Sequence, residues 1–133
     1  MYLLDTNICI AIIDRHPQAL NKFTRQSYLC YIPTVVQAEL YKGAYCSQKV
    51  EPNLEILNLF TDLLEIVDFD REAALEFGKI QSELRRKGKP TGDLDALIAA
   101  VARSRNDILV TNNTRHFINI DRLQLEDWLS SRS

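Results

Sequence analysis

Two carboxylates in the first third of the chain stand where an acidic side chain could do chemistry. Asp5 directly follows the apolar run 2–4 and precedes a helical pattern, which places it at the carboxyl end of a predicted strand, where open α/β sheets bind ligands. The same position suits an Asp that caps a helix. Glu39 lies three residues after Val36 and four before Gly43, on an apolar helical stripe. A carboxylate there implies a buried ion pair, a protonated acid, a cation shared with other carboxylates, or a side chain at the edge of the stripe.

Further polar candidates lie in the last third of the chain. Asp93 and Asp95 occupy the first turn of a predicted helix, where the helix dipole alone favours acids. Two positions apart, they point about 200° away from each other, so only one can face a given site. We expect Asp95 to face it and Asp93 to cap the helix or support the site from outside. Another predicted strand ends in Thr111, Asn112 and Asn113, a sequence that by itself is typical of a strand-to-turn exit.

Together these side chains predict an oxygen-lined crevice that selects a hard cation, Mg²⁺ or Mn²⁺. The two histidines, His16 and His116, have neither the spacing nor the Cys neighbours of a zinc site, and His16 is expected at the surface. The sequence contains no GxxxxGK, GxGxxG or GxSxG motif. This excludes P-loop nucleotide hydrolysis, dinucleotide binding of the Rossmann type and α/β-hydrolase chemistry.

The elements that must position these residues follow from hydrophobic periodicity. Short apolar runs alternate with longer segments of helical period, which predicts an α/β domain with a mainly parallel sheet. Thr34 and Gln37 form a predicted capping box, Asp70 caps a long helix that ends at Gly88, and the tail with Trp128 is expected to pack on the sheet. Strands are expected at 2–4, 28–32, 65–69 and 108–111, and further helices at 7–14, 53–64 and 93–105.

Composition limits the classes of protein to which the chain can belong. The 133 residues include 46% hydrophobic and 26% charged residues, which indicates an ordinary globular chain, expected to form one domain over residues 1–133. The longest apolar run, 96–102, is far short of the ~20 residues that span a bilayer, so we expect a cytoplasmic protein. Three cysteines without a CxxC pattern suit a reducing compartment. The net charge of −2 argues against a nonspecific binder of nucleic acid, but residues 79–133 alone carry 10 basic and 7 acidic groups.

Four segments carry a resemblance to a known family. They are MYLLDTNICI at the start, PTVVQAELYKGA around Glu39, GDLDALIAAVARSR around Asp95, and LVTNNTRHF near the end. In this order and spacing they span nearly the whole chain. The sequence resembles the PIN-domain nucleases and, within them, the VapC-type toxins of type II toxin-antitoxin systems.

The resemblance implies a fold, an activity and partners. The fold would be a three-layer α/β/α domain with a twisted, mainly parallel central sheet of strand order 3-2-1-4-5. The activity would be endonucleolytic hydrolysis of RNA phosphodiester bonds with Mg²⁺ or Mn²⁺. The implied partners are an RNA substrate, tRNA among the candidates, a cognate VapB-like antitoxin and a second copy of the chain in a homodimer, with no membrane involved.

The family's acidic site maps onto Asp5, Glu39 and Asp95 as metal ligands and catalytic residues. Its fourth position, an Asp in many PIN domains, falls on Asn113, which departs in charge but matches the TNN version of a VapC subgroup. His116 stands where some relatives carry another acid, and its role is open. The residues expected to support the site are Thr6, Asn7, Asp93, Thr111 and Asn112.

Two other functions compete with this reading. A haloacid-dehalogenase-like Mg²⁺ phosphatase also places an Asp after its first strand, but its general acid would fall on Asn7, which cannot donate a proton in that role. A non-catalytic PIN-like module that binds RNA or protein would agree with Asn113, but not with three intact acids. The basic residues expected to contact RNA phosphates are Arg85, Arg86, Lys87, Lys89, Arg103, Arg105 and Arg115.

Overall fold

Five short parallel strands form the centre of the molecule. The computed structural model describes residues 1–130, and its strands pair in the order β3-β2-β1-β4-β5 with every pairing parallel. This confirms the predicted fold class, strand order and parallel pairing. The strands are β1 (Tyr2–Leu4), β2 (Cys30–Pro33), β3 (Glu65–Val67), β4 (Ile108–Val110) and β5 (Gln124–Glu126).

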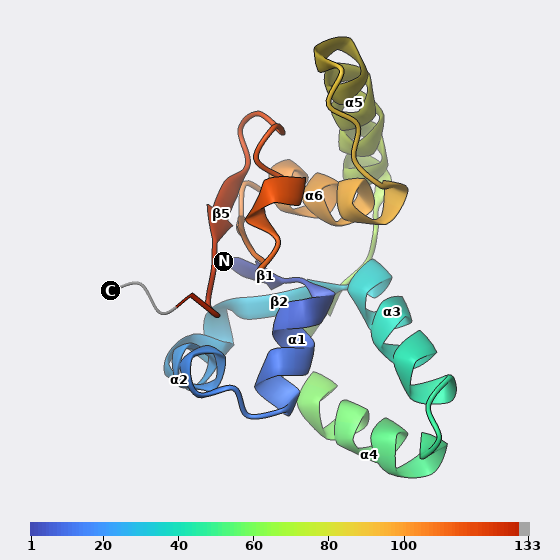
Figure 1. The fold of residues 1–133 in the computed structure, drawn as a ribbon, viewed down its shortest axis with the longest axis vertical. Coiled ribbons are helices and arrows are strands. Elements are labelled where there is room, and N and C mark those ends of the chain that lie inside the picture. The colour runs from blue at the N-terminus through green and yellow to red at the C-terminus, as the bar shows by residue number, and fades with distance from the viewer. Residues whose placement is uncertain (131–133) are drawn as a thin grey trace.

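Helices cover both faces of this sheet. Figure 1 shows α5 and α6 on one side of the strands and α1 to α4 on the other. None of the helices within residues 1–130 is both long and apolar enough to cross a membrane. The helices are α1 (Thr6–Ile13), α2 (Pro17–Gln26), α3 (Thr34–Tyr45), α4 (Val50–Thr61), α5 (Arg71–Lys87) and α6 (Asp93–Arg105), with the 3₁₀ turns η1 (Ser27–Leu29) and η2 (Thr114–His116).

The core lies between the sheet and these two helical layers. Central strands of a parallel sheet are buried on both faces, which is why β1 and β2 are continuous apolar runs without alternation. The run 96–102 of α6 is buried except for Leu97, so α6 is the central helix of its layer. Trp128 is fully buried, and its ring lies 5.6 Å from that of Tyr2, which confirms that the tail packs on the sheet.

Local capping fixes where helices begin and end. The Asp70 carboxylate accepts a hydrogen bond from Ala73 N at 2.9 Å, and Gly88 ends α5 with φ of 67°, both as predicted. The predicted capping box at Thr34 is wrong, because Pro33 occupies the cap position without a side-chain bond. The Thr34 hydroxyl instead accepts from Phe69 N, which ties the start of α3 to the exit of β3.

Several elements differ from the sequence-based expectation, among them β5, which was not predicted as a strand. Residues 17–26 form α2, which was not predicted; Pro17 occupies its first turn, a favoured position, and His16 caps it through Nδ1. Residues 27–29 form a 3₁₀ turn, so β2 begins later than expected. Helix α4 begins at Val50 rather than at residue 53.

Candidate active site

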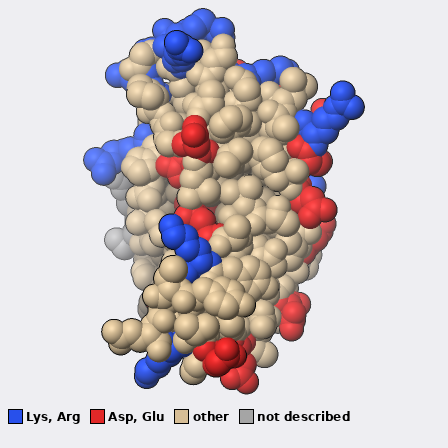
Figure 2. All heavy atoms as spheres, turned by 90° about the vertical axis from the view of Figure 1, so that its right-hand side faces the viewer, with Lys and Arg blue, Asp and Glu red and all other residues tan. Residues whose placement is uncertain are grey.

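The predicted site residues gather at the carboxyl end of the sheet. Asp5 follows β1, Thr111 follows β4, and the first turn of α6 brings Asp95 to the same edge; Glu39 comes from α3, which begins directly after β2. Because all strands are parallel, their carboxyl ends share one edge. In Figure 1 this edge lies to the right of β1 and β2, and Figure 2 looks onto it, with acidic side chains in the middle of the face and basic ones at its upper rim.

Asp5 is the buried member of the acidic group, with only 6% of the residue exposed. One carboxylate oxygen accepts from Ile8 N at 3.0 Å, so Asp5 also caps α1. Burial raises its pKa, hydrogen bonds with Thr111 and Ile8 act against that shift, and the charges of Asp95 and Glu39 raise it further. Asp5 therefore lies in the electrostatic field of both Asp95 and Glu39.

The other two carboxylates are each held by a neighbouring side chain. The Thr6 hydroxyl donates to Glu39 Oε1, which joins the start of α1 to α3. His116 Nδ1 lies 3.1 Å from Asp95 Oδ2, joining η2 to α6. Both Glu39 and Asp95 are partly exposed, so they border solvent while Asp5 forms the floor.

The strand exit after β4 supplies a hydroxyl and an amide. Thr111 is fully buried, and its Oγ1 accepts from Asn113 N at 3.0 Å while its own N–H bonds Glu126 O. Asn113 is half-buried and precedes η2, whereas Asn112 is exposed. Thr111 thus anchors the turn that presents Asn113 and also contacts Asp5.

Two more of the expected supporting residues, like Asn112, face solvent. Asn7 is exposed. Asp93 is also exposed and accepts a hydrogen bond from Gln81 Nε2 at 2.9 Å. The alternative that Asp93 caps α6 is wrong, because Gly92 occupies the cap position.

The fit of a divalent cation rests on the chemistry of these donors. Among residues 1–130, no three His, Cys, Asp or Glu side chains are arranged as a complete metal-ligand set. The acidic donors are nevertheless all oxygens, the class that Mg²⁺ and Mn²⁺ prefer, and their mutual repulsion at Asp5 is what a cation would relieve. The residues fit a hard cation and not a soft one.

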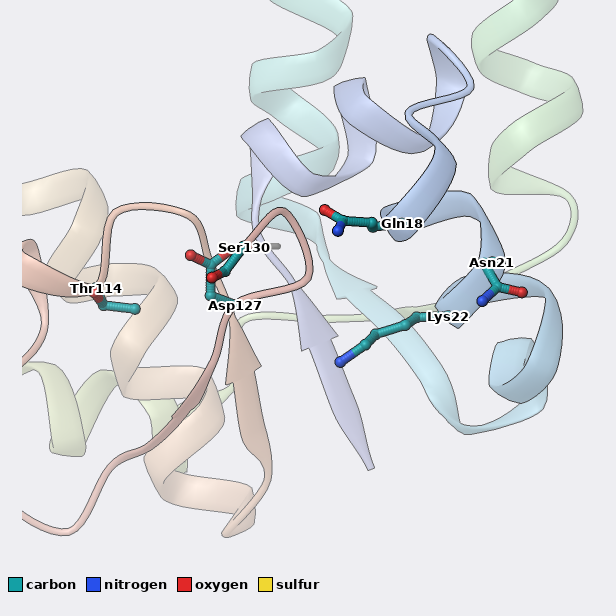
Figure 3. Close-up of a pocket in the computed structure, with 6 residues that line it drawn as sticks. All are labelled: Gln18, Asn21, Lys22, Thr114, Asp127 and Ser130. Atoms are coloured by element: carbon teal, nitrogen blue, oxygen red, sulfur yellow. The ribbon is translucent and has the colours of Figure 1, made fainter. Parts of the chain in front are cut away.

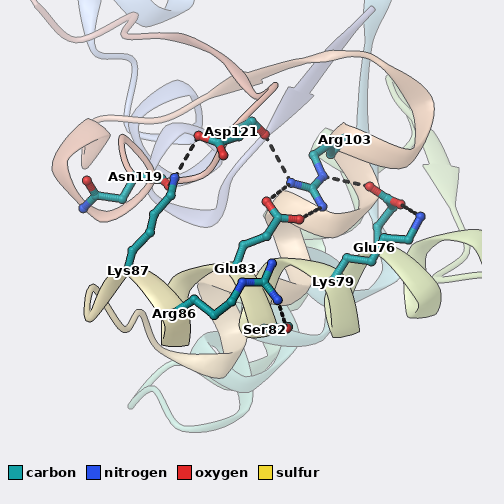
Figure 4. Close-up of polar contacts among 9 residues, drawn as sticks. All are labelled: Glu76, Lys79, Ser82, Glu83, Arg86, Lys87, Arg103, Asn119 and Asp121. Carbon is teal, nitrogen blue, oxygen red and sulfur yellow. Dashed lines mark hydrogen bonds and ion pairs between the residues drawn. The ribbon is translucent and has the colours of Figure 1, made fainter.

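One predicted RNA contact is contradicted by burial. The Arg103 side chain is 2% exposed and forms ion pairs with Glu76 at 2.7 Å and Glu83 at 2.9 Å (Figure 4). It also donates to the carbonyl oxygen of Asp121 at 3.2 Å. Arg103 is therefore a structural residue that joins α5, α6 and the segment before β5, and no RNA phosphate can reach it in this arrangement.

Two more of the predicted contacts are already engaged. Arg105 pairs with Asp107 at 3.0 Å and covers the ring of Tyr31; Asp107 directly precedes β4, at the sheet edge opposite the acidic site. Lys87 donates to Asn119 O at 2.7 Å and pairs with Asp121 at 2.8 Å (Figure 4). The other four members of the set, Arg85, Arg86, Lys89 and Arg115, are exposed, and Arg86 donates to Ser82 Oγ at 3.0 Å.

A polar cavity and two apolar grooves lie in the surface, and one of the grooves reaches the acidic group. Figure 3 shows a polar cavity of about 570 Å³ between α2 and the exits of β4 and β5, lined by Gln18, Asn21, Lys22, Thr114, Asp127 and Ser130. Two adjoining apolar grooves of about 330 and 350 Å³ run along α1 and α4. The second groove reaches Glu39. Sequence reasoning missed the polar cavity because it did not predict α2.

Comparison with known proteins agrees with this geometry. The PIN domain family matches residues 2–123. The chain is 43% identical over 129 residues to the tRNA(fMet)-specific endonuclease VapC of Shigella flexneri, covering 96% of this chain and 97% of that protein. It is 40% identical over 129 residues to ribonuclease VapC2 of Haemophilus influenzae strain Rd, covering 96% and 98%.

A solved structure gives the same result in three dimensions. DNA-bound VapBC from Salmonella typhimurium contains a chain that superposes with a TM-score of 0.91 at 39% identity, covering 96% of this chain and 97% of that one. Sequence, fold and the placement of the acidic residues therefore point to one family. The chain belongs to the VapC toxins, the PIN-domain ribonucleases of toxin-antitoxin pairs.

Proposed function

We propose that this VapC ribonuclease hydrolyses RNA with Mg²⁺ or Mn²⁺ held by Asp5, Glu39 and Asp95. The observation that carries the proposal is that three separate elements bring these carboxylates to the carboxyl end of the sheet, where Asp5 lies in the electrostatic field of the other two. We further propose initiator tRNA as the substrate, because a relative of 43% identity is named for cleaving tRNA(fMet). The site of action would be the cytoplasm, where tRNA is found.

The mechanism assigns each side chain a task. When bound, the cation supplies a Lewis acid that polarises the scissile phosphate and lowers the pKa of the attacking water. Asp5, which is hydrogen-bonded to Ile8 N and Thr111, would bind the cation. The Thr6 hydroxyl would orient the Glu39 carboxylate toward the cation. The Asn113 amide would donate to a phosphate oxygen, since an amide N–H donates without adding negative charge next to the substrate.

The RNA path is proposed to follow the basic rim beside the acidic group. Lys89 lies in the loop that leads to α6, Arg115 lies next to His116, and Arg85 and Arg86 end α5. All four are exposed, and their charges would hold phosphates on either side of the scissile bond.

The antitoxin is proposed to cover the apolar grooves along α1 and α4. Ile56, Leu59 and Leu63 on this face are between 49% and 67% exposed, and Ile10 on α1 is 44% exposed. Contiguous exposed apolar side chains of this kind mark protein interfaces, and the similar Salmonella typhimurium structure is a VapBC complex. Because one groove reaches Glu39, a partner there would also block the site. A homodimer remains a proposal that light scattering would test.

The proposed activity is tested by incubating the purified chain with initiator tRNA and with total cellular RNA, with Mg²⁺ or with EDTA. We expect Mg²⁺-dependent cleavage that maps to one site in the tRNA and is abolished by Asp5→Asn. Asn58→Ala, an exposed change on α4, serves as the control and should cleave normally. Cleavage that persists in Asp5→Asn would contradict the assignment, and release of phosphate from small phosphomonoesters would support the phosphatase instead.

A further inference from the structure

A side-chain contact between His116 and Asp95 joins two separate elements of the site, η2 and α6. The Nδ1 of His116 lies 3.1 Å from Asp95 Oδ2, across 21 residues of sequence. Because a carboxylate oxygen can only accept, the ring nitrogen must be the donor. The His116 side chain is 54% exposed and that of Asp95 is 32% exposed, so burial does not force the two together.

The backbone that carries His116 is fixed independently of this contact. His116 N donates to Asn113 O at 3.0 Å, which closes η2. The Thr91 hydroxyl donates to His116 O at 3.2 Å, and Thr91 lies four residues before Asp95 in the loop that enters α6. The backbone of His116 is thus bound through its N–H to the Asn113 turn and through its carbonyl oxygen to the segment that leads to Asp95.

A common arrangement appears when the three carboxylates are compared. One oxygen of each accepts a hydrogen bond from the chain: Asp5 from Ile8 N, Glu39 from Thr6, and Asp95 from His116. A carboxylate held through one oxygen loses rotational freedom and keeps a fixed direction for the other. Hydrogen-bond donors of this kind to metal-binding groups typically account for 10- to 100-fold in metal affinity.

We propose that His116 is a positioning residue that orients the Asp95 carboxylate for the cation, an inference that rests on the metal dependence proposed above. His116 acts through its Nδ1–H and does not itself touch the substrate. The same side chain joins Asp95 to η2, which directly follows Asn113. The residue proposed to bind the metal and the one proposed to bind phosphate are therefore both attached to η2.

The test compares two substitutions that differ in the donor they retain. His116→Ala removes the donor, whereas His116→Asn keeps an N–H group at nearly the position of Nδ1. Mn²⁺ binding is measured by titration calorimetry on the RNA-free chain, and cleavage of initiator tRNA is measured over a range of Mn²⁺ concentrations. His16→Asn, a histidine change at the cap of α2 where Asn is also a good cap, is the control, and thermal unfolding in EDTA verifies that each variant folds.

We expect His116→Ala to weaken Mn²⁺ binding by at least tenfold, His116→Asn to restore most of it, and saturating Mn²⁺ to return kcat of the Ala variant to within a few-fold of normal. Unchanged Mn²⁺ affinity in the Ala variant overturns the inference, and so does an Asn variant that binds no better than Ala. A lack of Mn²⁺ binding by the unaltered chain would instead overturn the proposed metal dependence.

Discussion

At the scale of single residues, Asp5 combines two tasks that sequence alone presented as alternatives. It caps α1 through Ile8 N, and it is the buried member of the acidic group. The two tasks depend on different properties of the side chain, because the cap needs only an acceptor oxygen while the proposed metal site needs the negative charge. Substitutions can therefore separate them.

Asp5→Asn keeps an acceptor for the cap, and it removes both the cost of burying a charge and the repulsion from Asp95 and Glu39. We expect the metal-free variant to be more stable than the unaltered chain by about 1 kcal/mol, roughly 4 °C in Tm. Asp5→Ala removes the charge and the cap together, and should be about 1 kcal/mol less stable than Asp5→Asn. Thermal unfolding in EDTA measures both. An Asn variant less stable than the unaltered chain would show that burial and repulsion do not disfavour the Asp5 charge in the folded state.

The site residues differ in how far sequence could predict them. Asp5, Glu39 and Asp95 stand at strand exits and on apolar helical stripes, where a carboxylate is conspicuous in the sequence itself. Arg103 was misassigned, because its burial depends on Glu76 and Glu83, which lie 27 and 20 residues away and come together with it only when α5 packs on α6. The local sequence pattern around a residue does not reveal a partner that is 20 or more residues away along the chain.

At the scale of elements, the pairing of α5 with α6 depends on an ion-pair cluster as well as on apolar packing. Arg103 contacts Glu76 and Glu83 on α5 and the Asp121 carbonyl before β5, so three segments share one buried guanidinium. Hydrogen bonds from Arg103 are the largest influence on the pKa of both glutamates and hold it below the ordinary value. The cluster therefore fixes the position of α6, which carries Asp95.

Arg103→Ala should be strongly destabilising because it takes the paired cation away from Glu83 and the nearer of two cations away from Glu76, which keeps only its 3.4 Å contact with the exposed Lys79 among its ion pairs within residues 1–130. Removal of one partner of a buried ion pair costs about 3–5 kcal/mol. Urea unfolding followed by circular dichroism would measure the loss. Arg86→Ala, an exposed change near the end of α5, the helix that carries both glutamates, is the control and should stay within about 0.5 kcal/mol of the unaltered chain. Equal stabilities of the two variants would contradict a structural role for Arg103.

The same cluster predicts a dependence on pH. The pKa of Glu76 and of Glu83 lies below the ordinary 4.5 in the folded chain, so the unfolded chain binds more protons as pH falls. Their contribution to stability is complete above pH 4.5 and is lost as pH falls through the lowered values. The free energy of unfolding should fall more steeply below pH 4.5 in the unaltered chain than in the Glu76→Gln, Glu83→Gln double variant. Parallel pH profiles would show that Arg103 does not stabilise the charged glutamates.

Helices and strands were predictable where the hydrophobic pattern was long or was bounded by a capping residue or a terminating glycine. The long helix between Asp70 and Gly88 had both a cap and a terminator, and it formed as predicted. Helix α2 was not predicted, because residues 17–26 are polar overall and bury only Ala19 and Phe23. The three residues of β5 are too few to show any period, and their pairing with β4 is a long-range event. Tertiary packing decides such segments.

At the scale of the whole molecule, charge is unevenly divided over the face that carries the site: basic side chains gather at its top, and acidic ones lie in its middle and at its lower and right edges, with one basic side chain beside the central acids (Figure 2). The net charge of −2 conceals this division, since residues 79–133 carry 10 basic groups against 7 acidic ones. A polyanion would therefore be attracted to the rim and be repelled from the centre until a cation is present.

The basic rim predicts a salt dependence of RNA binding. Replacement of Arg85, Arg86 and Lys89 together by Ala should weaken tRNA binding and reduce the slope of log K against log [KCl] by about 2 to 3. Binding is measured with the Asp5→Asn background to prevent cleavage. The control replaces Arg25, Lys49 and Arg71, which are also exposed, and should leave the slope nearly unchanged because they do not belong to the rim. Equal reductions in both triple variants would mean that the RNA has no preferred path on this surface.

The apolar grooves along α1 and α4 have a consequence for the chain when it is alone. Ile56, Leu59 and Leu63 would be covered in a complex, but in the free chain they face water. Exposed patches of this kind promote self-association, which excluded salts such as sulfate strengthen. The concentration of dispersed, active toxin in a cell that has lost its antitoxin would thus be limited by aggregation, and the same surface that receives an inhibitor would set an upper bound on toxicity.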